Sequence, residues 1–207
     1  MNVAEALEGL PRRRFAVGEE VLPTQLAGAA LIFVDEGLVV LRSAANGVRR
    51  RTITCHAGSG SLILPPEAGE MLAALTEASV VVVRSAELEE LVAAPERSHA
   101  LLIALMQTLR QKHAAIANMS RLHHVDRVRE KLIELARDHG RVGRDGIRLD
   151  FPLTHDLLGE MTGSARETVT RALDELQRDG FVERTGRTYC LHVPPDELVV
   201  TAVTVRQ

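Results

Sequence analysis

The chain has 207 residues, 45% of them hydrophobic and 2% aromatic, and its 25 Lys and Arg against 28 Asp and Glu leave a net charge of −3. This balance excludes a polybasic mode of nucleic-acid binding, and the few aromatic side chains argue against a single-strand binder, which needs stacking platforms. No apolar run approaches the ~18 residues of a membrane span and no signal peptide is recognisable, so we expect a cytoplasmic chain without membrane contact. Cys55 and Cys190 lie far apart in the sequence, so we expect no metal site.

Residues 1–93 have the pattern of an all-β domain. Short apolar segments are separated by turn-forming Gly, Asn-Gly and Pro-Pro residues, a pattern typical of a compact β-sheet structure. The segments are 14–17, 31–34, 38–41, 51–55, 62–64 and 79–83. We expect them to form a β-roll of the jelly-roll type.

Residues 94–124 form the second predicted region, a long helix from Pro95 to Leu122 that ends in a hinge at His123–His124. A seven-residue apolar repeat favours a two-stranded coiled coil, and therefore a homodimer. The predicted interface residues are Leu102, Leu105, Leu109, Ile116 and Met119. Lys112 and His113 interrupt the seam, so the alternative is an amphipathic helix that lies on its own β-roll.

Residues 125–207 form the third predicted domain, in which 153–191 read as helix, tight turn, helix and β-hairpin. Thr154 can cap the first helix and Gly163 ends it. Ser164 then begins the second helix as its N-cap, with Glu167 completing a capping box. The buried stripe of the second helix is Val169, Ala172, Leu173 and Leu176. This is the plan of a winged helix-turn-helix, which places one helix in the major groove of DNA.

The opposite face of that second helix is polar. It could be a solvated surface with i, i+4 ion pairs, Glu167 with Arg171 and Asp174 with Arg178. The hairpin that follows favours DNA instead, because its Thr185-Gly186 turn would set Arg184 and Arg187 beside the helix, where they can meet phosphates. Beyond the hairpin, 199–205 alternate apolar residues and threonine, which predicts one more strand.

The stretch Ser164-Ala165-Arg166-Glu167-Thr168-Val169-Thr170-Arg171, with Leu153-Thr154 before it and the 180–191 hairpin after it, resembles the signature of the CRP/FNR family of transcription regulators. The resemblance implies that Arg166, Glu167 and Arg171 read base edges in double-stranded DNA. It also implies that the protein recognises a TGTGA-like half-site within an inverted repeat and that other residues contact the DNA backbone there. As an activator, the protein would further contact RNA polymerase. The backbone-contact residues are Thr154, Ser164, Thr168, Gly186 and Arg187.

The segments 15–22 and 32–41 resemble the sensor roll of the same family, so the likeness extends over nearly the whole chain. Cyclic-nucleotide-binding relatives carry a cassette, G-E-L/I followed after a short helix by R-S/T-A, whose arginine and backbone donors hold the cyclic phosphate. The corresponding residues here, 58–78, contain no Arg or Lys. A buried phosphate without a cationic partner, near Glu67, Glu70 or Glu77, is strongly disfavoured, so we expect regulation without cyclic nucleotide.

The residues give little support to the other kinds of sensor known in the family. An iron-sulfur cluster needs several cysteines near the N-terminus, and none is there. Haem could be ligated by Cys55 and His56, but neighbouring side chains in a strand point in opposite directions and would not face the same iron. A redox role of Cys55 depends on the exposure of its thiol. An unidentified small ligand, haem or Cys55 redox chemistry thus remain alternatives for an effector. No motif in the sequence links a nucleophile with a base and an orienting group, so we predict neither an enzymatic activity nor a cofactor.

The sequence therefore predicts an α+β protein with an N-terminal β-roll sensor domain, a long dimerisation helix and a C-terminal winged helix-turn-helix. Its expected function is sequence-specific, homodimeric regulation of transcription.

Overall fold

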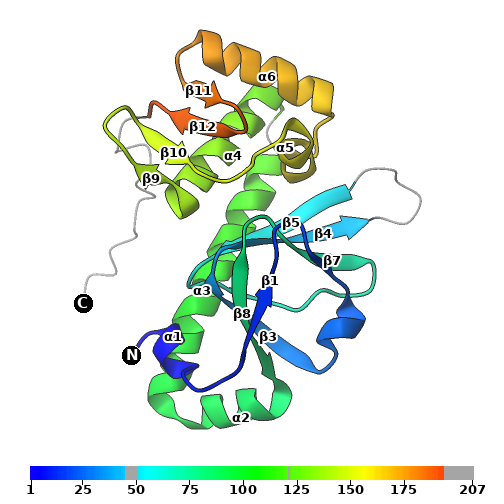
Figure 1. The fold of residues 1–207 in the computed structure, drawn as a ribbon, viewed down its shortest axis with the longest axis vertical. Coiled ribbons are helices and arrows are strands. Elements are labelled where there is room, and N and C mark those ends of the chain that lie inside the picture. Colours follow the sequence, from blue (N-terminus) through cyan, green and yellow to red (C-terminus); the bar gives the residue numbers. More distant parts are fainter. Residues whose placement is uncertain (45–50, 121, 194–207) are drawn as a thin grey trace. The chain divides into compact units, whose positions relative to one another are not determined.

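A computed structural model describes residues 1–44, 51–120 and 122–193. The chain divides into two compact units, Met1–Ala117 and Asn118–Gln207. Sheets and helices occur in both, so the predicted α+β class, with a β-roll, a long helix and a winged helix-turn-helix, is confirmed (Figure 1). Within the described residues, no helix is both long enough and apolar enough to span a bilayer. The predicted strand at 199–205 lies outside the described residues.

The first unit is built around two antiparallel four-stranded sheets, ordered β1-β8-β3-β6 and β2-β7-β4-β5. The elements are β1 (Arg12–Phe15), β2 (Glu20–Val21), the 3₁₀ helix η1 (Pro23–Leu26), β3 (Ala29–Glu36), β4 (Leu38–Ala44), β5 (Arg51–Gly58), β6 (Leu62–Ile63), β7 (Glu70–Ala74) and β8 (Ala78–Arg84). Each predicted apolar segment contributes to a strand, whereas β2 and β7 were not predicted. This arrangement is the expected roll.

The valine run of β8 shows how the roll packs. Val80 belongs to the apolar cluster enclosed between the two sheets, and Val82 packs against that cluster. Val81 and Val83 point to the other side and join a second cluster formed with helices. Because both faces of this strand are covered, it carries an uninterrupted apolar run instead of the alternation of a half-exposed strand.

Three helices cover the outer face of the β1-β8-β3-β6 sheet in the second cluster: α1 (Val3–Ala6), α2 (Ser85–Ala93) and α3 (Pro95–Met119). The face of α3 that carries Ala100, Leu101 and Ala104 is buried there. Small side chains at two of these positions let the helix approach the sheet closely. The helix therefore lies on its own roll, as the alternative prediction stated.

The predicted seam residues of α3 lie on a different face. Leu102 is 56% exposed, Leu109 55% and Ile116 65%, and Leu105 is also exposed. The side chain of Met119 lies outside the described part of the structure. The helix thus packs on the roll with one stripe and leaves a second apolar stripe open to solvent.

The second unit combines helices with a small antiparallel sheet of order β11-β12-β10-β9. Its elements are α4 (His124–His139), β9 (Arg141–Val142), β10 (Ile147–Leu149), α5 (His155–Thr162), α6 (Arg166–Arg178), β11 (Val182–Thr185) and β12 (Thr188–Leu191). The buried side of α4 includes Val128, Leu132 and Leu135, and this helix packs against α5 and α6. The unit has the helix-turn-helix and hairpin wing that the sequence predicted.

Candidate nucleic-acid interface

One cap and two glycines shape the helix-turn-helix: Thr154 begins α5, Gly163 ends it, and Gly159 faces the turn that follows. The Thr154 hydroxyl accepts a hydrogen bond from the backbone N–H of Leu157 at 3.1 Å, which confirms the predicted N-cap of α5. Gly163 ends α5 in the left-handed conformation, with φ of +63°. A Cβ at Gly159 would lie only 2.7 Å from the carbonyl oxygen of Ser164, so the close approach of the two helices requires glycine there.

The start of α6 differs from the predicted capping box. The N-cap is Ala165, which makes no side-chain capping bond, and Ser164 is only 2% exposed. The Ser164 hydroxyl lies 3.1 Å from Nδ1 of His124 on α4. The prediction of Ser164 as N-cap is therefore wrong, because the left-handed turn at Gly163 directs this hydroxyl toward α4. The family resemblance implies a DNA backbone contact for Ser164, and in the free protein its hydroxyl is buried against α4.

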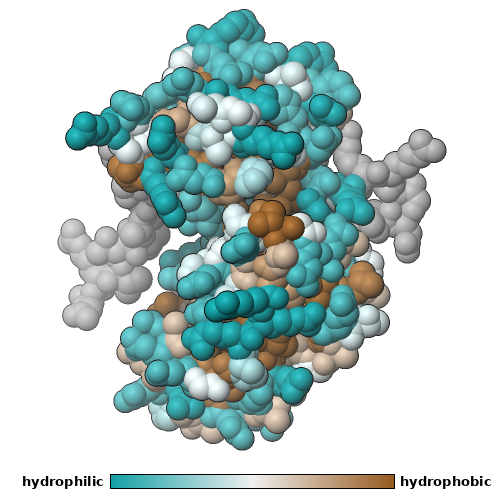
Figure 2. Space-filling view, viewed as in Figure 1, coloured by the Kyte–Doolittle hydropathy of each residue, from teal (hydrophilic) through white to brown (hydrophobic). Residues whose placement is uncertain are grey.

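The predicted stripe of α6 is confirmed: Val169, Ala172, Leu173 and Leu176 are all buried. The opposite face is open to solvent, and Figure 2 shows a mainly hydrophilic surface over this helix. Arg166, Glu167 and Arg171 are exposed, whereas Thr168 is half-buried. The two arginines and the glutamate therefore project from the N-terminal half of α6, the half that reaches base edges when such a helix enters the major groove.

Ion pairing does not account for this face. Within the described residues Arg171 makes no ion pair with Glu167, and Arg178 donates to the backbone carbonyl of Asp174 at 3.2 Å. Arg166 and Asp156 are 3.8 Å apart with each side chain 65% exposed, a weak pair in water. Among the described residues the predicted i, i+4 pairs of a solvated surface are thus not formed, which leaves Arg171 available to a ligand and Arg166 held only weakly.

The wing is a short hairpin whose strands pair from Val182 with Leu191 to Thr185 with Thr188. Gly186 turns the chain with φ of +65°, and Arg187 beside it is exposed. The carbonyl of Arg187 accepts a hydrogen bond from the backbone N–H of Leu153 at 3.0 Å. This bond holds the wing tip next to the start of α5. The predicted backbone-contact residues Thr154, Gly186 and Arg187 therefore lie in neighbouring segments.

His155 was not among the predicted site residues. Its two ring nitrogens contact Thr170 on α6 and Arg184 on β11. Burial, followed by the positive charges of Arg184 and Arg166, lowers the pKa of His155 below its usual value. The sequence carried only a weak signal for this residue, a histidine directly after the capping Thr154, and no spacing connects it with an arginine 29 positions later.

The part of the roll interior that the cassette region lines is apolar. Ile63, Leu72 and Ala74 from the cassette region belong to the apolar cluster between the sheets. The segment between β6 and β7 forms no helix, and residues 58–78 contain no Arg or Lys. An aliphatic interior of this kind offers a phosphate no compensation for its lost hydration.

Cys55 lies in the same apolar cluster and is 9% exposed. The exposure on which a redox role depends is therefore small. His56 beside it is also buried, at 5% exposure.

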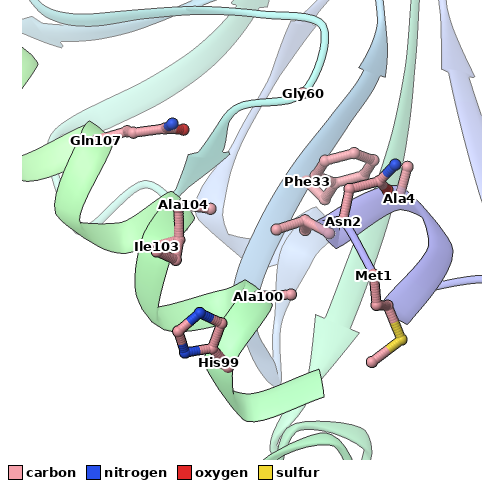
Figure 3. Close-up of a pocket in the computed structure, with 11 residues that line it drawn as sticks. Met1, Asn2, Ala4, Phe33, Gly60, His99, Ala100, Ile103, Ala104 and Gln107 are labelled. Carbon is pink, nitrogen blue, oxygen red and sulfur yellow. The ribbon is translucent and has the colours of Figure 1, made fainter. Parts of the chain in front are cut away.

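A groove of about 490 Å³ lies on the helical side of the first unit, between the N-terminal residues, β3 and α3 (Figure 3). Phe33 and Ile103 contribute apolar walls, and Asn2, His99 and Gln107 contribute polar groups. No Lys or Arg lines it. The groove therefore suits an uncharged or apolar molecule better than a phosphate.

Comparison with known proteins agrees with this geometry. Residues 126–196 match the model of the Crp-like helix-turn-helix domain. The chain is 32% identical over 100 residues to the global nitrogen regulator of Synechocystis sp., which is 48% of this chain and 44% of that protein. It is 29% identical over 94 residues to the CRP-like cAMP-activated global transcriptional regulator of Mycobacterium tuberculosis, 45% of this chain and 42% of the relative. The matched part thus spans less than half of these curated relatives.

Solved structures share the fold over most of the chain. A mutant of CooA from Carboxydothermus hydrogenoformans superimposes with a TM-score of 0.75 at 19% identity, covering 95% of this chain and 94% of that one. The c-di-GMP responsive global regulator CLP of Xanthomonas campestris gives a TM-score of 0.71 at 20% identity, covering 93% and 99%. At these identities the likeness establishes the fold.

Proposed function

Because the chain belongs to the CRP/FNR family of transcription regulators, we propose that it binds an inverted-repeat DNA site as a homodimer and regulates transcription without cyclic nucleotide. The observation that carries the proposal is the exposed face of α6 beside the wing, with Arg166 in only a weak, solvent-exposed ion pair and Arg171 in none among the described residues. A DNA-binding regulator of this kind acts in the cytoplasm, and activation through RNA polymerase follows from the family resemblance.

The proposed base contacts are made by Arg166, Glu167 and Arg171. An arginine can donate two hydrogen bonds to O6 and N7 of guanine, and a glutamate can accept one from N4 of cytosine. The proposed backbone contacts are Thr154, Thr168, Gly186 and Arg187. Ser164 is left out because its hydroxyl is buried against α4.

A second copy of the chain is the proposed partner of the open stripe on α3. Leu102, Leu105, Leu109 and Ile116 are exposed although they are apolar, and they follow the seven-residue repeat of a coiled coil. Dimeric helix-turn-helix proteins read two half-sites about 34 Å apart, one turn of duplex DNA, with two recognition helices related by a two-fold axis. Dimerisation would therefore explain both the stripe and the expected symmetry of the site.

Independence from cyclic nucleotide is supported by the apolar side chains that the cassette region contributes to the roll interior and by the absence of Arg and Lys from residues 58–78. The groove lined by Phe33, Ile103 and His99 leaves a second candidate, a regulator gated by an uncharged or apolar molecule. The two candidates differ in whether the purified protein binds its site without an added effector.

Selection of bound sequences from a random duplex pool, with purified protein and no effector, tests the proposal. We expect enrichment of a palindrome with half-sites one helical turn apart. The double variant Arg166→Ala/Arg171→Ala should enrich nothing, whereas Arg141→Ala, on the far sheet edge, should select the same palindrome. Absence of enrichment would refute sequence-specific binding, a lone half-site would refute the dimer, and enrichment only with an added cyclic nucleotide would refute effector independence.

A further inference from the structure

His155 lies where three elements of the second unit meet. It is the first residue of α5. Its Nδ1 is 2.8 Å from Oγ1 of Thr170 on α6, and its Nε2 is 3.1 Å from Nη1 of Arg184 on β11. The imidazole therefore connects the recognition helix with the wing through its two ring nitrogens.

The protonation state of His155 follows from these partners. A guanidinium group only donates hydrogen bonds, so Nε2 has to accept the one from Arg184. The proton of the neutral ring is then on Nδ1, which donates to Oγ1 of Thr170. The Thr170 hydroxyl donates in turn to the backbone carbonyl of Arg166 at 3.0 Å. Donors and acceptors alternate along the whole chain of bonds only when the imidazole is neutral.

Arg184 is held by further contacts within the wing. Its Nε donates to the carbonyl oxygen of Gly186 at 2.8 Å, and its guanidinium carbon lies 5.9 Å from the centre of the Tyr189 ring. Within the described residues its Nη2 makes no hydrogen bond and no ion pair, and the residue is exposed. An arginine already fixed in this way loses little rotamer freedom when an anion binds it.

We propose that His155, as the neutral imidazole, is a positioning residue that holds Arg184 so that its free N–H groups meet a DNA backbone phosphate beside the wing. The ligand rests on the proposed function, whereas the bonds among His155, Thr170 and Arg184 belong to the protein alone.

Protonation breaks this arrangement. A proton on Nε2 would replace the acceptor by a donor that faces a guanidinium group, and Arg184 would lose its bond to His155 and keep only its contacts within the wing. The charged groups that act on His155 are Arg184 and Arg166, which disfavour the proton, and Asp174 and Asp156, which favour it. Because these effects lower the pKa of His155, DNA affinity should decrease as the pH falls below about 6.5, the ordinary pKa of histidine.

Four variants separate positioning from direct contact. His155→Phe removes the acceptor, and His155→Gln keeps an acceptor that does not titrate. Arg184→Ala removes the cation, and Arg141→Ala is the charge-matched control, because β9 lies at the opposite edge of the sheet from β11. Affinities for the selected palindrome and for an unrelated duplex are measured by fluorescence anisotropy over a salt series, at high and at low pH.

His155→Phe should weaken binding to both duplexes about three- to tenfold, the cost of ordering a free arginine, with an unchanged salt slope. His155→Gln should restore most of the affinity and remove the pH dependence. Arg184→Ala should reduce the salt slope by about 1, and adding His155→Phe to it should change nothing more. Arg141→Ala should match the wild type.

Additive losses in the double variant would overturn the proposal. So would a wild-type affinity that rises as the pH falls, because His155 would then contact phosphate as a cation. Thermal unfolding shows whether each variant folds, and 15N NMR of the free wild-type protein reports the tautomer without DNA. A proton on Nε2 at neutral pH refutes the positioning role, whereas a wild type that binds no duplex refutes the proposed function and leaves the tautomer result standing.

Discussion

Replacement of Arg171 by alanine should remove sequence specificity without affecting the fold. Arg171 is exposed on α6 and makes no hydrogen bond or ion pair among the described residues, so its loss should change the free energy of unfolding by no more than about 0.5 kcal/mol. A bidentate contact to guanine contributes about 1–3 kcal/mol of discrimination between bases. Affinity for the selected palindrome should therefore fall roughly five- to 150-fold, while affinity for an unrelated duplex should fall much less.

The assay is a titration of duplexes in which each base pair of the half-site is changed in turn. Arg171→Ala should become indifferent to one of these changes. Arg187→Ala, at the wing tip, should weaken binding to all duplexes alike and reduce the salt slope by about 1. If both variants lost affinity equally for every duplex, or if Arg171→Ala kept the full base preference, the assigned roles would be wrong.

Three further perturbations test the roll, the stripe on α3 and the histidine. Gly37 and Gly60 both have φ of +85°, but a Cβ at Gly37 would lie 2.2 Å from a backbone carbonyl oxygen, whereas Gly60 has open space. Each alanine variant should lose about 1–2 kcal/mol in urea unfolding for its backbone conformation, and Gly37→Ala about 1–3 kcal/mol more; equal losses would contradict the steric argument. Leu109→Asp should convert the dimer to monomers in sedimentation equilibrium, and Leu64→Asp, at a leucine that is also exposed, should not; an unchanged dimer in both would place the interface elsewhere. Because the pKa of His155 is lowered in the folded state, the unfolded chain takes up the proton first. The contribution of His155 to the free energy of unfolding is then complete above about pH 6.5 and is lost as the pH falls below that value. If His155→Gln keeps the wild-type dependence of unfolding free energy on pH, this contribution of His155 is refuted.

Local patterns predicted the parts of the DNA-binding unit that depend on neighbouring residues. The stripe from Val169 to Leu176 followed from helical periodicity, and the cap at Thr154 and the end at Gly163 followed from residue type and spacing. The contacts that join the elements were not predictable in this way. Nothing in the spacing of His155 and Arg184 indicates that an imidazole and a guanidinium meet.

The capping box at Ser164 shows how tertiary contact overrides a local motif. The S-x-x-E spacing fits a cap, but a hydroxyl can make the same kind of bond to any acceptor or donor within reach. Here the chain turns through Gly163 and brings Ser164 against His124 of α4, so the helix begins one residue later without a side-chain cap. In the same way, the apolar residues of α3 allowed either a coiled coil or packing on the roll, and the helix has one stripe for the roll and another that stays exposed.

The order of residues alone was sufficient for the α+β class, the β-roll, the long helix and the winged helix-turn-helix, because strand alternation, helical periodicity and turn residues act over a few positions along the chain. Only the tertiary structure decided which polar groups form hydrogen bonds within the protein and which remain exposed to a ligand. That division depends on groups distant in sequence coming within hydrogen-bond distance, as Ser164 does with α4 and His155 does with the wing.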